Sequence, residues 1–434
     1  MHGHATPPPI AHAMTSPVTS QTDSDSAVEF VLELGRSLHG LGYPSHWLED
    51  HLGEACLGVG LVGQFFVTPT SIFAAFGEGR SQHTHLLRLE GSEQHLERLT
   101  RVLECARDVI ERRSTPAEGT SALRALSLAP ARYRPIVTAA AFALSGAAAC
   151  RFLGGGALEM AAAAFLGAVL AVLSSFAGRI AGLGRVFPAL AAFVVSALAA
   201  SAGRLCGFND PIASLASLLI LLPGLHLTAA MAELASQHLV SGTSRILGAL
   251  TQLLAIAFGV AMGSRVVEML LGAPVAITPT ALPLWTEGVA LILAPVAFTI
   301  LLRAAPSDYP WILGVGVPAH IVGRLVAPPL GSELAAFLAA LTAGLLSHAI
   351  ARVRSAPAAV TLVPSLLLLV PGSIGFRGLT MLIDRDITSG VEGAFRMLLL
   401  ASALVAGILL ATALVPSSGL AKRRPQGMSG GSSA

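Results

Sequence analysis

From residue 135 onward, the chain consists of long apolar segments separated by short polar breaks. A membrane-spanning helix needs about 17–25 predominantly apolar residues, fewer where the bilayer adapts. Ten segments satisfy this length, so the sequence predicts a polytopic α-helical membrane protein. The predicted spans lie near residues 135–151, 157–178, 186–203, 211–230, 244–264, 286–303, 311–327, 333–351, 358–381 and 394–415.

The two halves of this apolar region match each other in register. Leu221–Gly224 reads Leu-Leu-Pro-Gly and Leu369–Gly372 reads Leu-Val-Pro-Gly, an offset of 371 − 223 = 148 residues. The first and sixth spans start 286 − 135 = 151 residues apart. The pattern predicts two five-span repeats, residues 135–265 and 286–415, joined by a loop over 266–285. Because each repeat has an odd number of spans, the second repeat must be inverted relative to the first.

The region before the spans has a different pattern. Residues 1–26 are rich in Pro, Ser, Thr and His and predict a disordered tail. Residues 27–115 alternate between helical spacing and short β-rich runs, which predicts a small α+β domain. Its expected elements are a helix ending at Gly40, a helix over Ser45–Leu57 with Ser45 as N-cap, a hairpin turning at Thr68–Ser71, a strand over His85–Leu89 and a helix over Ser92–Arg113. Residues 116–134 are predicted as a linker and 416–434 as a tail.

Composition supports a membrane protein and excludes several other classes. Of 434 residues, 53% are hydrophobic and 12% are charged, and the mean hydropathy is +0.71; a soluble domain carries about 25% charged residues. The net charge of +2 gives no reason to expect nucleic acid. The four cysteines are widely spaced, which predicts neither a zinc site nor a disulfide framework. No metal or cofactor is expected, and no cleaved signal peptide is recognised.

Positive charge favours one orientation in the membrane. Most arginines that flank the spans, together with Lys422, fall on one side if the N-terminal domain is cytoplasmic. This set comprises Arg124, Arg132, Arg134, Arg179, Arg185, Arg303, Arg352, Arg354, Lys422, Arg423 and Arg424, whereas the other side keeps Arg151, Arg204, Arg265 and Arg385. Both termini are therefore expected in the cytoplasm, with the spans in the plasma (inner) membrane.

The two Pro-Gly pairs are the candidate substrate site. Pro223 and Pro371 have no amide hydrogen and interrupt a helix, while Gly224 and Gly372 let the chain turn. The half-helix that follows each glycine would direct free N–H groups and a positive dipole end at a bound carboxylate. Hydroxyl and guanidinium groups that could add contacts are Thr228, Ser373 and Arg377. The alternative is a pair of proline kinks that serve only helix packing.

Ionisable residues near the spans are candidates for proton coupling, because burying a charge in lipid is costly. They are His226, Glu233, Asp210 and His320. A histidine titrates near neutral pH and suits proton transfer, but one bonded to a backbone carbonyl between helices is an equal alternative for His226 and His320. Asp210 is alternatively an N-cap, and Glu233 is alternatively a solvated helix end. Arg324 and Arg377 either pair with an acid or extend to the membrane interface.

The predicted N-terminal domain shows no recognisable catalytic set. Its histidines, which are His39, His46, His51, His83, His85 and His95, are interpreted as a surface scatter rather than a metal site. A regulatory or gating role is our hypothesis for this domain.

Five segments carry a resemblance to a known family, and they are Gly40-Leu41-Gly42, Thr68-Pro69-Thr70, Leu221–Thr228, Leu239–Arg245 and Val370–Gly378. In these segments the chain resembles the threonine/serine exporter family. The resemblance implies a soluble N-terminal domain joined to ten spans, and export of L-threonine and L-serine driven by the proton motive force. A related two-component architecture implies a dicarboxylate exporter as the alternative. A membrane-anchored enzyme is a less favoured alternative, because an anchor needs no broken helices. The sequence does not decide between a monomer and a homo-oligomer.

Overall fold

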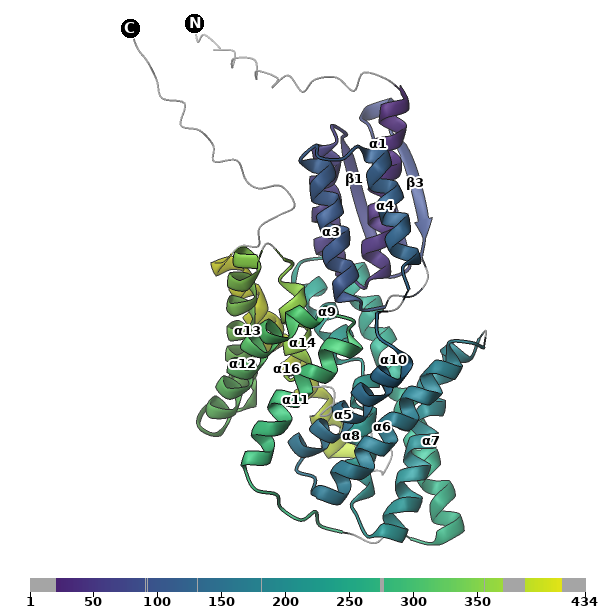
Figure 1. Cartoon of the computed structure of the whole chain (residues 1–434), viewed down its shortest axis with the longest axis vertical. Coiled ribbons are helices and arrows are strands. Elements are labelled where there is room, and N and C mark those ends of the chain that lie inside the picture. The colour runs from purple at the N-terminus through teal and green to yellow at the C-terminus, as the bar shows by residue number, and fades with distance from the viewer. Residues whose placement is uncertain are drawn as a thin grey trace, which may run out of the picture.

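The computed structural model describes residues 21–89, 91, 93–130, 132–180, 182–273, 277–354, 356–369 and 387–415. A small N-terminal domain of helices and strands lies at one end of a larger body of helices (Figure 1). We call this end of the helical body the domain side and the opposite end the far side.

The N-terminal domain packs helices against one face of a three-stranded sheet. Its strands are antiparallel in the order β1-β2-β3, and Phe73 is the cross-strand partner of both Phe66 and Leu86. Apolar side chains from the helices and the inner sheet face, including Phe30 and Ile72, form its buried core. The elements are α1 (Gln21–Gly40), α2 (Ser45–Gly58), β1 (Gly63–Thr68), β2 (Ser71–Phe76), β3 (His83–Arg88), α3 (Leu96–Ile110) and α4 (Pro116–Leu128), with a 3-10 turn at Gly79–Ser81.

The structure confirms the predicted hairpin at Thr68–Ser71 and corrects three predictions about this domain. Helix α1 begins at Gln21, so residues 21–26 are helical rather than part of a tail. The predicted linker contains α4, which packs on α1 and α3 and starts with a capping box between Thr115 and Glu118. Ser45 is the first residue of α2 and not its N-cap, a position that Pro44 occupies.

The helical body contains seven described helices that are long and apolar enough to cross a membrane, or eight if one bent pair is a single span. Apolar helix α11 has 17 residues, and the ninth predicted span extends from α14 beyond the described residues. The count of ten spans therefore stays a prediction. The elements are α5 (Pro135–Phe152), α6 (Ala157–Ala177), α7 (Leu183–Cys206), α8 (Asp210–Leu218), α9 (Gly224–Ala235), α10 (Leu239–Leu271), α11 (Trp285–Leu301), α12 (Tyr309–Leu330), α13 (Ser332–Arg354), α14 (Ala359–Leu367) and α16 (Ile387–Leu414).

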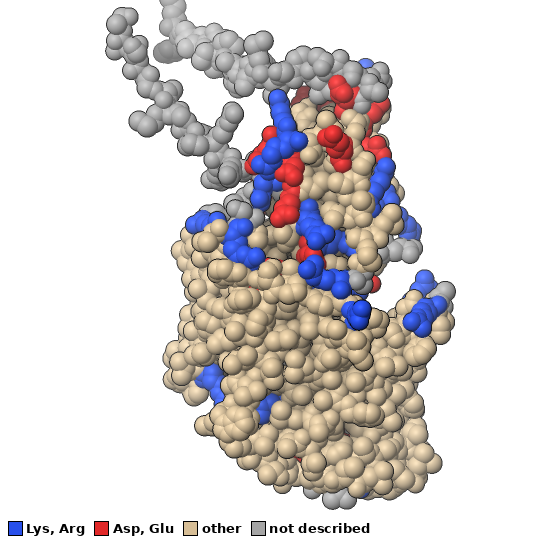
Figure 2. All heavy atoms as spheres, in the orientation of Figure 1, with Lys and Arg blue, Asp and Glu red and all other residues tan. Residues whose placement is uncertain are grey.

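Charged side chains are unevenly distributed over the molecule. Figure 2 shows that they gather on the N-terminal domain and where it meets the helical body, whereas this face of the helical body is mostly uncharged. A broad uncharged belt is expected of a surface that lies in hydrocarbon.

The same glycine-mediated helix contact occurs in both halves of the helical body. A Cβ atom at Gly259 in α10 would collide with α7, and one at Gly407 in α16 would collide with α13. The atoms met belong to Ala189, Ala192 and Phe193 in α7, and to Phe337, Ala340 and Leu341 in α13. Every residue of the second contact follows its counterpart by 148 positions (407 − 259, 337 − 189, 340 − 192 and 341 − 193). Small residues thus bring two helix backbones together in each half.

The first helices of the two halves, α5 and α11, pack against each other in opposite directions. Tyr133, just before α5, donates a hydrogen bond to the carbonyl of Ala304, just after α11, at 2.7 Å. Arg151, near the end of α5, donates to the hydroxyl of Thr286 at the start of α11, also at 2.7 Å. The two helices are therefore antiparallel, and residue 304 lies on the domain side.

Candidate functional site

The fourth predicted span is broken at the first Pro-Gly pair, as the sequence predicts. Helix α8 continues as a 3-10 turn over Leu219–Leu221, and α9 begins at Gly224 with its axis bent by 50° from the segment before it. The Gly224 amide donates to the carbonyl of Leu222 at 2.8 Å, which closes a tight turn around Pro223. The proline prevents the helix from continuing because it has no amide hydrogen.

The break leaves polar backbone groups in the middle of the helical body. Gln252 of α10 donates from its side-chain nitrogen to the carbonyl of Leu221 at 2.7 Å. At the start of α9, Leu227 is the first residue whose amide donates back to Pro223, at 3.0 Å. The amides of Leu225 and His226 have no backbone acceptor in the described part of the chain. This turn therefore has the free N–H groups and the dipole of an anion site.

The break lies between the apolar cores of the two halves. Leu222 and Leu227 pack in a core that includes α7 and α10 residues, and Met397 of α16 joins them. Leu225 packs against a second core formed by residues of α12, α13, α14 and α16. The start of α9 is therefore in contact with both halves, as expected of a transporter site at a repeat interface.

The structure places the remaining predicted substrate residues as follows. Thr228 is buried in α9, and its hydroxyl donates to the Gly224 carbonyl at 3.1 Å. Pro371, Gly372, Ser373 and Arg377 lie outside the described residues. Gln252 was missed by the sequence reasoning, although a single amide in a long apolar span was the available signal.

We expect replacement of Gln252 by leucine to destabilise the protein. The substitution leaves the Leu221 carbonyl without its donor, which costs about 1–3 kcal/mol for a buried group. Thermal unfolding of the purified protein in detergent should show a lower melting temperature. Thr251→Ala, on the exposed side of the same turn of α10, is the control and should melt as the wild type does. Equal melting temperatures for both variants would contradict this role of Gln252.

Asp210 and Glu233 lie at opposite ends of the broken helix. Asp210 is the first residue of α8 on the far side, and Asn209 rather than Asp210 is the N-cap, accepting from the amide of Ile212 at 3.1 Å. The buried carboxylate of Glu159 accepts from the Asn209 amide at 2.9 Å. The start of α8 is thus fixed by side-chain caps.

Glu233, near the end of α9, is completely buried on the domain side, which overturns its interpretation as a solvated helix end. One carboxylate oxygen accepts a hydrogen bond from the backbone amide of Ser45, the first residue of α2, at 2.9 Å. The other lies 3.0 Å from the guanidinium of Arg245 in α10. A carboxylate at the start of a helix also interacts favourably with its dipole. Glu233 therefore joins the N-terminal domain to the broken helix, a partnership that no local signal in the sequence indicated.

The two histidine candidates differ in their surroundings. His226 has an exposed side chain at the start of α9. His320 in α12 packs against Phe152, with ring centroids 5.3 Å apart, and its Nε2 has no hydrogen-bond partner in the described residues. In the same region, Glu287 pairs with Arg324 and lies 4.0 Å from Arg151. Arg324 thus pairs with an acid, one of its two predicted roles.

The histidines of the N-terminal domain are not all on its surface. His39 is buried and bonds through Nε2 to the Thr68 carbonyl at 3.0 Å, and His95 is the buried N-cap of α3. Burial, with His238 and Arg245 nearby, lowers the pKa of His46 to about 4. Burial, with Arg98 and Arg303 nearby, lowers the pKa of His95 to about 4 as well. Both histidines are therefore neutral at pH 7.

These low pKa values predict that acid destabilises the protein. Between pH 6.5 and pH 4, His46 and His95 are protonated in the unfolded chain but not in the folded protein, so stability falls as the pH decreases through this window. Melting temperatures measured at pH 7.5 and pH 5 should show this decrease. The double variant His46→Asn and His95→Asn, which retains an N-cap side chain at 95, should show a smaller decrease. An unchanged pH dependence would contradict the assignment.

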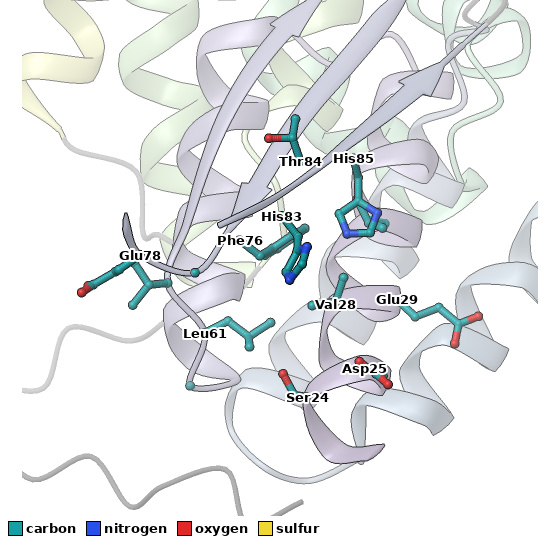
Figure 3. A pocket seen from close by; sticks show the side chains of 14 residues that line it. Ser24, Asp25, Val28, Glu29, Leu61, Phe76, Glu78, His83, Thr84 and His85 are labelled. Carbon is teal, nitrogen blue, oxygen red and sulfur yellow. The ribbon is translucent and has the colours of Figure 1, made fainter. Parts of the chain in front are cut away.

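One open hollow of about 860 Å³ lies in the N-terminal domain, away from the helical body (Figure 3). Its polar side chains do not converge on one point. Figure 3 shows Glu78 pointing away from the other labelled side chains, and Glu29 pairs with Arg124 at 2.6 Å. No group of three or more metal-ligating side chains occurs in the described part of the chain.

Comparison with known proteins gives a family assignment for both halves. A model described as putative threonine/serine exporter matches residues 29–267, and one described as threonine/serine exporter matches residues 287–414. An uncharacterized protein of Schizosaccharomyces pombe is 24% identical over 84% of this chain and 49% of its own length. Pheromone-regulated membrane protein 10 of Saccharomyces cerevisiae is 23% identical over 80% of this chain and 46% of its own.

A third fungal relative matches a shorter stretch. Pheromone-regulated membrane protein 10 of Candida albicans is 27% identical over 54% of this chain and 22% of its own length. The chain thus spans about half, or less, of the length of these curated relatives. No solved structure matches it significantly.

Proposed function

This chain belongs to the threonine/serine exporter family, and from that membership we propose that it is a secondary active transporter exporting L-threonine and L-serine. Export is coupled to the proton motive force and proceeds by alternating access between two inverted repeats. In this proposal the protein lies in the plasma (inner) membrane with both termini in the cytoplasm, and it acts as a transporter rather than as an enzyme.

The observation that carries the proposal is the broken helix at Pro223. Its half-helix amides without backbone acceptors suit the carboxylate of an amino acid, and its contact with both cores suits a site that opens alternately to either side. Gln252 retains a side-chain oxygen close to the break, which is a suitable acceptor for the substrate ammonium or hydroxyl group. Pro371, Gly372, Ser373 and Arg377 complete the site in this proposal, and His226, His320, Glu233 and Asp210 stay the candidates for proton transfer.

Two features of the fold support inverted repeats. The glycine contacts of α7–α10 and α13–α16 are related by 148 residues at every position. The equivalent helices α5 and α11 are antiparallel, as an inverted second copy requires. Arg303 lies on the domain side and Arg151 at the other end of the α5–α11 pair, in agreement with the cytoplasmic orientation expected from positive charge.

Purified protein in liposomes with an imposed pH gradient tests the function. Labelled threonine should move only when the gradient is present, and excess serine should inhibit it. Gradient-driven flux of succinate without flux of threonine would replace the substrate by a dicarboxylate while retaining a transporter. Absence of flux for threonine, serine and succinate alike would contradict the proposal.

A further inference from the structure

We propose that the N-terminal domain bridges the two halves of the helical body on one side, and that it must release one half for each transport cycle to be completed. The inference rests on the proposed function, because it assigns a step to the alternating-access cycle. It is carried by two separate sets of contacts, one to the first half and one to the second.

The first contact is made with the end of α9, the turn at residues 236–238 and the start of α10. Besides the buried Glu233–Ser45 bond, Ser241 donates from its hydroxyl to the carbonyl of Val67 in β1 at 2.7 Å. His238 lies 3.1 Å from Glu49 of α2, whose other carboxylate oxygen accepts from the Val67 amide at 2.8 Å. The N-terminal domain thus holds the end of the broken helix through buried and half-buried polar groups.

The second contact is made with the turn after α11, residues 302–304. The first two amides of α3, those of Leu96 and Glu97, donate to the carbonyls of Leu302 and Arg303 at 3.0 and 3.2 Å. Arg303 also pairs with Glu93 at 2.7 Å. Leu302 and Ala304 are buried in the same core as the interior of the N-terminal domain.

The two contacted turns share a conformational feature. Gln237 in the first turn and Arg303 in the second have positive φ angles of 66° and 51°. A non-glycine residue in this conformation carries a cost of order 1 kcal/mol, which the surrounding contacts must offset. In each turn this residue ends a helix, because the His238 amide donates to the Glu233 carbonyl and the Ala304 amide donates to the Thr299 carbonyl. The N-terminal domain therefore contacts two compact helix ends of the same type.

The bridge limits the movement of the two halves. Alternating access requires one half to move against the other around the central site. The first contact fixes α9 and α10 of the first half, while the second fixes the end of α11 in the second half. While both contacts hold, the domain-side ends of the halves cannot separate. Opening on that side therefore requires one contact to break.

Reversible cross-linking tests this step in the full-length protein. On a background in which the four native cysteines are alanine, Glu49→Cys with His238→Cys links the first contact, and Glu93→Cys with Arg303→Cys links the second. The reagent is a bismaleimide with an internal disulfide that reduction cleaves. Glu29→Cys with Arg124→Cys, a pair inside the N-terminal domain, is the matched control.

With both contacts linked, gradient-driven threonine flux should fall at least about tenfold, recover on reduction, and stay unchanged in the control. When only one contact is linked, threonine flux should fall only if that contact is the one that opens. Flux within twofold of the control when both contacts are linked would overturn the proposal.

Hydrogen exchange at residues 236–242 and 302–304 gives a readout that needs no substrate. Exchange in at least one of these segments should slow when both contacts are linked, because the link prevents release. Unchanged exchange in both segments overturns the release step even if threonine is transported. Slowed exchange without flux of any tested substrate supports release and contradicts the proposed function.

Discussion

Replacing Glu233 by alanine is expected to cost about 3–5 kcal/mol of stability, because it leaves the largely buried guanidinium of Arg245 without its anion. The same change removes the acceptor of the Ser45 amide at the start of α2. Thermal unfolding in detergent should show a large decrease in melting temperature, and limited proteolysis should cut between the N-terminal domain and α5 earlier than in the wild type.

Two further variants make this expectation specific. The double variant Glu233→Gln and Arg245→Gln removes both charges and should lose less stability than Glu233→Ala, since no unpaired charge stays buried. Glu268→Gln breaks an exposed pair with Arg265 at the far end of the same α10 and should cost less than about 1 kcal/mol. A Glu233→Ala protein as stable as Glu268→Gln would contradict the buried ion pair.

Valine at Gly259 or at Gly407 is the second change with a large expected effect. Either side chain would meet the backbone of the facing helix, α7 or α13, so the helices must separate along their length. Overpacking of a well-packed interior costs typically about 1–3 kcal/mol, and more where the obstacle is backbone. The yield of monodisperse protein and its melting temperature should both fall, and by similar amounts for the two variants.

Gly248→Val is the control for this pair of variants. Gly248 lies in α10, eleven positions before Gly259, and a Cβ atom there would meet nothing within 4 Å. Its yield and melting temperature should stay close to those of the wild type. A large effect at Gly259 without one at Gly407 would contradict the equivalence of the two halves.

The parts of the fold that local patterns determine could be predicted from the sequence. The break at Pro223 follows from a missing amide, and the hairpin at Thr68–Ser71 follows from turn residues between β-rich runs. Helix α4 was missed although Thr115 and Glu118 form a capping box, because Pro116, Gly119 and Ser121 make the start of this 13-residue helix resemble a linker.

The contacts between the N-terminal domain and the helical body could not be predicted in the same way. Glu233 and Ser45 are 188 positions apart, and neither carries a local signal for the other. Burial of an acid at a helix end depends on what covers that end, which periodicity does not reveal. The candidate site was therefore predictable at the break itself, and Gln252 was recognisable as an isolated amide in an apolar span, whereas the partnerships of Arg245 and Glu49 required the structure.

The glycine contacts also determine which parts of the helical body can deform. Two helices that touch backbone to backbone have no flexible side chains between them to accommodate sliding, so α7–α10 and α13–α16 should each behave as a rigid body. Any hinge must then lie outside these pairs, and the turn at Leu222–Gly224, where the helix is already interrupted, lies outside both of them. The residue that interrupts the helix near the proposed substrate site would then also be the pivot around which the protein changes shape.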